Sequence, residues 1–128
     1  MTFLQIIGAL IAFLLLVLGL IYWRADRETL SAAEFRADSG YQTAPLNHGV
    51  TAYQSFGPFD GEAVVIVHGG TLGSMAYQAY VPPLVKDGWR VIVYDQYGRG
   101  FSDRPNHKLT IDLMRLQLRD LLEHLQIG

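Results

Sequence analysis

The sequence contains no cysteine among its 128 residues. This absence excludes disulfide bonds, thiolate metal sites and a cysteine nucleophile. Basic residues are also few, since ten Lys and Arg stand against twelve Asp and Glu, and they form no cluster. Because nucleic-acid binding needs a basic patch that neutralises phosphates, we expect no nucleic-acid partner for a chain with a net charge of −2.

Charged side chains are missing altogether from residues 1–23, and the stretch from Phe3 to Trp23 is almost wholly apolar. At 1.5 Å per residue, about 20 helical residues cross a hydrocarbon core of ~30 Å, so this stretch predicts a single transmembrane anchor. A cleaved signal peptide and a buried core helix are the alternatives. The signal peptide is disfavoured because no Lys or Arg precedes the run and because the run is too long for a signal-peptide apolar region.

The residues that follow the apolar run predict its orientation. Arg24, Arg27 and Arg36 all come after it, so the positive-inside rule favours a cytoplasmic soluble part. Residues 24–48 mix charge with Ala and Leu, and we interpret them as a solvated juxtamembrane linker with at most a short helix over residues 28–37. A segment that packs on the bilayer or on the domain is the alternative.

Residues 49–128 carry the pattern of an α/β fold. The β-branched runs over residues 63–67 and 89–94 fit strands that are buried on both faces of a parallel sheet. The segment 74–87 between them has helical length, so the three elements predict a right-handed βαβ unit. A weaker alternation over residues 49–56 predicts a leading antiparallel strand.

Two details concern the helices of this unit. The pair Pro82-Pro83 cannot lie inside an unbroken helix, so it predicts a kink or two short helical pieces that meet near Val81. A second helix begins at an N-cap, Thr110, and we expect Gly128 to stop it. Its core face is predicted from one apolar stripe, namely Met114, Leu118, Leu121, Leu122 and Leu125.

The predicted sheet has only about three strands and an apolar edge, and an alternating β/α pattern calls for another strand after the last helix. We therefore expect the chain to be the N-terminal part of a longer protein.

His68-Gly69-Gly70-Thr71 directly follows the first buried strand. In open α/β sheets the chemistry lies at the carboxyl ends of the strands. Glycines there let the backbone turn sharply and aim N–H groups into the space above the sheet. Two such groups can stabilise an oxyanion during acyl transfer. The alternative is that these glycines serve only the geometry of the strand-to-helix turn.

A second loop, Asp95-x-x-Gly98-x-Gly100-x-Ser102, follows the second buried strand. An aspartate at a strand end accepts hydrogen bonds from the N–H groups of its loop, and glycines permit positive φ angles. We interpret this loop as structural. Ser102 lies outside a G-x-S-x-G sequence, so it lacks the context of a nucleophile.

The remaining histidines, His48, His107 and His124, have separations that fit no metal cluster, and we expect neither metal nor cofactor.

Taken together, these motifs resemble the α/β-hydrolase superfamily. An apolar strand precedes His-Gly-Gly, and Val-Ile-Val-Tyr-Asp-Gln-Tyr-Gly-Arg-Gly-Phe-Ser-Asp-Arg-Pro precedes an amphipathic helix that ends in Leu-Gln-Ile-Gly. Residues 49–128 are thus similar to the N-terminal half of such a domain. The resemblance implies that Gly70 lends a backbone N–H to an oxyanion hole, with Thr71 beside it. It also implies a set of residues that shape the surrounding loops: His68, Gly69, Asp95, Gly98, Gly100 and Ser102.

The resemblance further implies a nucleophile after the next strand, beyond Gly128, followed by an acid and a histidine. None of these three is in the chain. We therefore expect the N-terminal fragment of a membrane-anchored, esterase-like or lipase-like hydrolase, inactive by itself, whose substrate is a small-molecule or lipid ester. The His-Gly-Gly-Thr start is more similar to esterase-like and C–C-hydrolase-like members than to dehalogenases.

Two rival interpretations belong to other classes. One is a non-catalytic scaffold of the same fold that is tethered to the membrane. The other is a complete small membrane protein whose partial sheet pairs with a partner chain.

Overall fold

The computed structural model describes residues 2–25 and 31–128, and it divides the chain into two units, the second of which begins at Ala32. The first unit consists of helix α1 (Phe3–Ala25), which has an 18-residue window of mean hydropathy 2.8 and no buried residue. By length and composition this helix can cross a membrane, a criterion that a signal sequence also meets. Arg27 lies outside the described residues.

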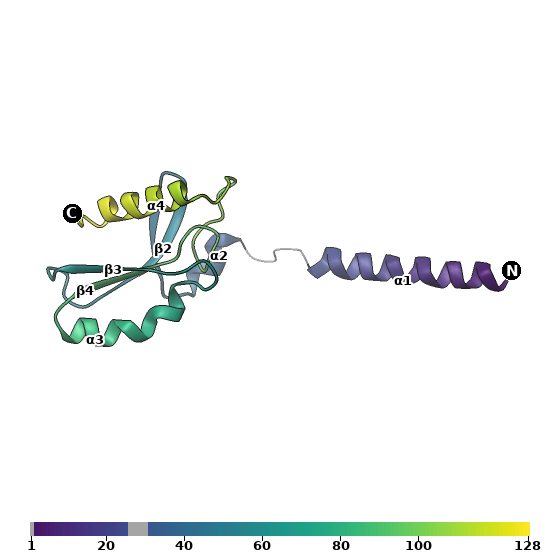
Figure 1. The fold of residues 1–128 in the computed structure, drawn as a ribbon, viewed down its shortest axis with the longest axis horizontal. Coiled ribbons are helices and arrows are strands. Elements are labelled where there is room, and N and C mark those ends of the chain that lie inside the picture. The colour runs from purple at the N-terminus through teal and green to yellow at the C-terminus, as the bar shows by residue number, and fades with distance from the viewer. Residues whose placement is uncertain (1, 26–30) are drawn as a thin grey trace. The chain divides into compact units, whose positions relative to one another are not determined.

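The second unit contains a four-stranded sheet in the order β1-β2-β4-β3. Strands β1 (Gln42–Leu46) and β2 (Gly49–Phe56) form an antiparallel hairpin, and β2 is also antiparallel to β4 (Arg90–Tyr94). Strand β3 (Ala63–Val67) pairs with β4 in parallel, as expected for the two strands of a βαβ unit (Figure 1).

Strand β1 corrects two expectations, namely a sheet of about three strands and a linker that extends to residue 48. Its sequence Gln-Thr-Ala-Pro-Leu shows no apolar alternation, and only Ala44 is fully buried. Pro45 lacks a backbone donor, a deficiency that an edge strand tolerates. The strand forms because β2 offers it a complementary edge through a tight turn, which is a tertiary cause that a local pattern does not reveal.

The two parallel strands differ in burial. All five residues of β4 are buried, because neighbours pair with it on both sides. Strand β3 stands at the edge of the sheet, its first four residues are half-buried, and Val67 is 48% exposed. The expectation of burial on both faces therefore holds for β4 and is wrong for β3.

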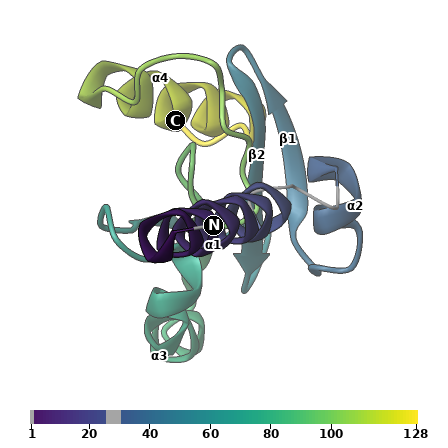
Figure 2. The ribbon, with the colours of Figure 1, turned by 90° about the vertical axis from the view of Figure 1, so that its right-hand side faces the viewer.

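Helices cover both faces of the sheet, and Figures 1 and 2 show α3 and α4 on opposite sides. A 3₁₀ helix η1 (Ser74–Tyr80) leads into α3 (Val81–Lys86), so the predicted break at Val81 is confirmed. Gly88 follows α3 with a φ of +91°, the left-handed conformation that ends many helices. The alternate residues Val91 and Val93 of β4 pack on the α3 side.

Helix α4 (Ile111–His124) covers the other face, over Ile92 and Tyr94. The Thr110 side chain accepts a hydrogen bond from the N–H of Leu113, which confirms the predicted N-cap. The predicted stop at Gly128 is wrong, because the helix ends at His124 and Gln126 takes the left-handed conformation instead.

The core face of α4 is rotated relative to the predicted apolar stripe. Its buried residues are Leu113, Gln117, Asp120 and Leu121, whereas Met114 is only half-buried. Two polar side chains lie inside because each has a partner there. The Asp120 carboxylate, for example, accepts hydrogen bonds from Asn47 at 2.9 Å and from Arg119 at 2.7 Å. A stripe that is drawn from apolar residues alone misses such positions.

Tyr94 makes the stability of the second unit depend on pH in the alkaline range. Burial raises the pKa of Tyr94 to about 12, from its ordinary value of 10.0. The unfolded chain therefore ionises this phenol first, and the contribution of Tyr94 is fully present below pH 10 and is lost as the pH rises towards 12. We expect the free energy of unfolding to fall by roughly 2–3 kcal/mol over that interval.

Denaturant titrations between pH 8 and 12 measure this effect, with Tyr94→Phe as the matched variant. The variant should lose most of the decline and keep only a part from Tyr97, whose pKa is also raised by burial. An equally steep decline in the variant would contradict the assignment.

Candidate active site

Two glycine-bearing loops begin side by side at one edge of the sheet. The first, residues 68–73, follows β3, and the second, residues 95–103, follows β4. Because Val67 pairs with Tyr94 in the parallel register, the two loops start at the same level. This is the carboxyl edge of the parallel strands, where open α/β sheets place their chemistry.

Asp95 joins the two loops from below, and its side chain is buried. One carboxylate oxygen accepts the backbone N–H of Ser74 at 2.7 Å, at the start of η1. The other accepts the N–H of Phe101 at 3.0 Å, within the second loop. Two glycines pack closely on this carboxylate, since a Cβ on Gly73 or Gly100 would lie 2.9 Å or 2.1 Å from an oxygen of Asp95.

Ser102 and Gln117 hold the backbone of the second loop. The Ser102 hydroxyl donates to the carbonyl of Asp95 at 2.5 Å and accepts from the N–H of Ala52 at 2.9 Å.

Gln117 is fully buried in α4, accepts from the N–H of Tyr97 at 2.9 Å and donates to the Asp95 carbonyl at 3.1 Å. Sequence reasoning missed Gln117, although its position between the apolar Leu113 and Leu121 was a usable signal.

His68 is buried beneath the first loop and faces the second. Its Nε2 accepts the backbone N–H of Gln96 at 2.9 Å. An imidazole nitrogen that accepts carries no proton, so the proton lies on Nδ1, which donates to the carbonyl of Gly69 at 2.6 Å. The Gln96 side chain completes the link by donating to the His68 carbonyl at 3.0 Å.

Gly70 and Thr71 are exposed at the top of the first loop. Among the described residues, neither backbone N–H has an acceptor. The space around Gly70 is open, because a Cβ there would meet nothing within 4 Å. From the second loop, Arg99 reaches across and donates from Nε to the carbonyl of Gly70 at 2.7 Å. Gly98, beside it, turns the chain at a φ of +78°.

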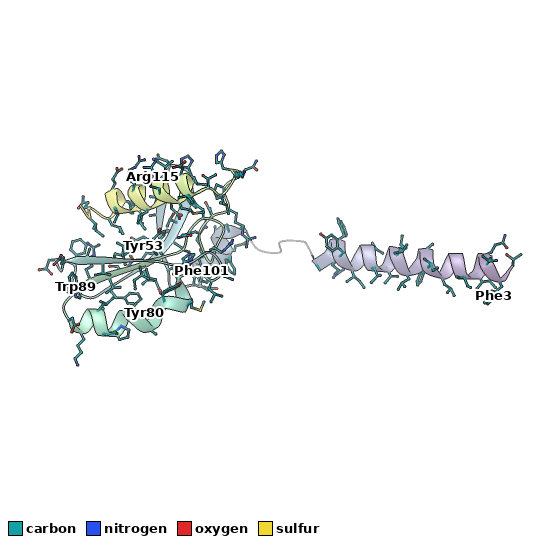
Figure 3. The ribbon with its side chains drawn as sticks, viewed as in Figure 1. Phe3, Tyr53, Tyr80, Trp89, Phe101 and Arg115 are labelled. Carbon is teal, nitrogen blue, oxygen red and sulfur yellow. The ribbon has the colours of Figure 1, made fainter. Side chains whose placement is uncertain are left out.

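Helix α2 (Ala32–Ala37) docks on the second loop. An Arg36 Nη1 group donates to Asp103 at 2.6 Å and to the carbonyl of Phe101 at 3.2 Å. Phe101 is labelled in Figure 3. The centroid of its ring lies 4.9 Å from the ring centroid of Phe35 and 4.8 Å from that of Tyr41. Of the two interpretations weighed for this segment, packing on the domain is therefore the one that the described part supports.

Groups that could complete a catalytic triad are not assembled in the described ranges. The hydroxyl of Ser74 pairs with that of Tyr41 at 3.0 Å, and Ser102 is bonded to backbone. His48 and His107 lie edge to face, with ring centroids 5.9 Å apart, and His124 is on α4. Within residues 2–25 and 31–128, no group of three or more His, Asp or Glu is arranged to hold a metal ion.

The chain resembles known proteins over this same region. A family model described as alpha/beta hydrolase fold matches residues 62–128. A haloalkane dehalogenase from Mycobacterium marinum is 42% identical over 53 residues, which are 41% of this chain and 18% of that protein. A non-heme chloroperoxidase from Streptomyces lividans is 32% identical over 75 residues, 59% of this chain and 27% of that protein.

Solved structures agree with these matches. A bromoperoxidase from Bacillus anthracis superposes with a TM-score of 0.62 at 34% identity, over 68% of this chain and 32% of that one. Haloalkane dehalogenase DpaA from Paraglaciecola agarilytica gives a TM-score of 0.63 at 28% identity, over 67% and 31%. The expected distance from dehalogenases is not supported, since dehalogenases stand among these relatives.

The chain spans only 18% of the length of the dehalogenase from Mycobacterium marinum that it matches. Within that span the likeness is consistent, because the family match covers more than half of the chain and the βαβ unit with both of its loops lies inside it. The chain therefore belongs to the α/β-hydrolase family.

Proposed function

We propose that this chain supplies the oxyanion-binding part of an α/β hydrolase that cleaves esters, with the backbone N–H groups of Gly70 and Thr71 as donors. The observation that carries the proposal is that these two N–H groups are exposed and have no hydrogen-bond acceptor among the described residues. They are adjacent and lie at the carboxyl end of β3. A Cβ on Gly70 would meet nothing within 4 Å, so the loop is open at this residue.

The chemistry needs such donors. When a nucleophile adds to an ester carbonyl, negative charge gathers on the carbonyl oxygen, and two preorganised N–H groups stabilise it by about 3–4 kcal/mol per donor. The histidine passes the proton that it took from a serine nucleophile to the leaving alcohol as the C–O bond breaks, and water then hydrolyses the acyl-enzyme to the acid and the free serine. For ester cleavage the nucleophile is therefore Ser, one of the two expected types (Ser or Asp), and it would come with its His and acid partners from residues beyond Gly128.

We propose α1 as the anchor of this hydrolase, with the soluble part in the cytoplasm, because Arg24 and Arg36 follow the apolar stretch. An anchor favours an apolar substrate, such as a lipid ester, that reaches the site from the bilayer. Protease digestion of sealed vesicles whose cytoplasmic face points outward tests the orientation. A soluble part that stays protected from the protease in these vesicles would refute the cytoplasmic orientation.

The site itself can be tested by removing one donor. Thr71→Pro deletes the N–H of Thr71, and the φ of Thr71 is not in the positive region, which proline cannot adopt. In a gene product that continues past Gly128 and carries a nucleophile, we expect kcat for p-nitrophenyl esters to fall about 10²–10³-fold. Thr71→Ala is the matched control, because it changes the side chain and keeps the N–H, and its kcat should stay near the wild-type value.

The 128-residue chain alone should show no turnover of the same esters, because it has donors and no nucleophile. Measurable turnover by this chain would refute the proposal. If the longer product proves inactive towards esters while it folds and stays in the membrane, the rival scaffold function is favoured instead.

A further inference from the structure

We propose that Arg99 is a positioning residue that orients the Thr71 N–H of the oxyanion site, an inference that rests on the proposed function. Arg99 belongs to the loop after β4, whereas the donors belong to the loop after β3. Its Nε lies 2.7 Å from the carbonyl oxygen of Gly70. The second loop is thus hydrogen-bonded to the peptide group that carries the N–H of Thr71.

The geometry of the peptide bond explains the effect. The carbonyl of Gly70 and the N–H of Thr71 belong to one planar group, and all described peptide bonds are trans. In a trans peptide the C=O and N–H bonds point in opposite directions. An arginine that holds the oxygen on one side therefore aims the N–H towards the other side, away from Arg99.

The neighbouring donor is held in the same way by a different residue. The N–H of Gly70 shares its peptide group with the carbonyl of Gly69, which accepts the proton of His68 Nδ1 at 2.6 Å. His68 is buried and locked by Gln96, so this peptide is fixed from within the domain. The peptide groups of the two donors are thus held by different residues, one by the buried His68 and the other by the exposed Arg99.

The hydrogen bond from Arg99 matters because little else restrains the Gly70–Thr71 peptide. A Cβ on Gly70 would meet nothing within 4 Å, and glycine has wide freedom in φ and ψ, so the Gly70–Thr71 peptide has little local restraint of its own. Arg99 itself is restrained, since its Nη1 donates to the carbonyl of Gly98 at 2.9 Å. It also stands between Gly98 and Gly100, both in the left-handed conformation, and Gly100 rests on buried Asp95. Such restraint is the preorganisation on which oxyanion stabilisation depends.

A first experiment needs no turnover. Amide ¹H–¹⁵N heteronuclear NOEs are measured on the 128-residue chain in detergent, for wild type and Arg99→Met. We expect the NOE of Thr71 to fall in the variant while that of Gly70, which His68 holds, is unchanged. Arg104→Met, which removes an exposed arginine just after the second loop, should alter neither NOE. Equal NOEs at Thr71 in wild type and Arg99→Met would overturn the inference.

A second experiment measures ester hydrolysis in a gene product that continues past Gly128 and carries a nucleophile. Arg99→Met should lower kcat for esters about 10–100-fold and leave KM within about twofold, because the orientation of the donor matters in the transition state. Affinity for a boronic acid that mimics the tetrahedral intermediate should fall by the same factor. Arg99→Lys keeps a cationic donor and should recover part of the loss, and Arg104→Met should behave as wild type.

The outcomes separate the two proposals. A change in KM alone, or a kcat equal to that of Arg104→Met, would overturn the role of Arg99 and leave the oxyanion site standing. A wild-type product that hydrolyses no ester would overturn the proposed function, whereas the NOE of Thr71 would still decide whether Arg99 positions its peptide.

Discussion

Gly100→Ala is expected to lower the free energy of unfolding of the second unit by about 3–5 kcal/mol, enough to unfold a marginally stable domain. The new Cβ would lie 2.1 Å from one Asp95 oxygen and 2.3 Å from Cγ. The aspartate cannot withdraw, because both of its oxygens hold backbone N–H groups. The φ of +49° adds a backbone cost of about 1–2 kcal/mol for a residue with a Cβ.

Gly40→Ala is a matched control for the backbone contribution. Gly40 also takes a positive φ, +72°, but a Cβ there would meet nothing within 4 Å. We expect this variant to lose only about 1–2 kcal/mol. Denaturant unfolding of both variants in detergent isolates the contact with Asp95 as the difference. Equal losses would show that the contact is relieved by a small shift of the loop.

Asp95→Ala is expected to destabilise the same unit by about 2–5 kcal/mol. Two N–H groups, those of Ser74 and Phe101, lose their acceptor, and each unsatisfied donor in a buried position costs about 1–3 kcal/mol. Ser74 is fully buried, so water cannot replace the carboxylate there without rearrangement. Because these two bonds tie η1 to the second loop, we expect the two loops of the candidate site to separate.

Asp95→Asn makes the test sharper, because it keeps the size of the side chain. The amide retains one acceptor oxygen, and its NH₂ group faces the remaining N–H donor, so about half of the loss is expected. Asp112→Asn is the control, since the Asp112 side chain is 86% exposed, and should change the unfolding free energy by no more than about 0.5 kcal/mol. An Asp95→Asn variant as stable as wild type would refute this account of Asp95.

Elements with a strong local cause could be predicted from the sequence. The β-branched run of β4 led to a buried strand, and the Pro82-Pro83 pair led to two helical pieces that meet at Val81. Thr110 was recognised as an N-cap because its side chain acts within one helical turn. Each of these features depends on residues that are close together in the chain.

Features that depend on distant partners were missed or placed wrongly. Strand β1 is held by β2, and Gln117 is buried because it bonds to a loop 20 residues away in the sequence. Helix α2 docks through Arg36 and Asp103, which are 67 positions apart. Polar residues such as these look solvated in a one-dimensional pattern, because their partners become visible only once the chain is folded.

Strand periodicity, helix breaks and glycine are local properties, so the α/β class, the βαβ unit and the two glycine-bearing loops were predictable from the amino-acid pattern. Which groups of those loops meet depends on the folded arrangement of the chain. That arrangement brought Asp95 under both loops and Arg99 onto the carbonyl of Gly70, contacts that join residues 21 and 29 positions apart. The parallel pairing of β3 with β4 is the physical reason, since it sets the two loops beside each other at one edge of the sheet.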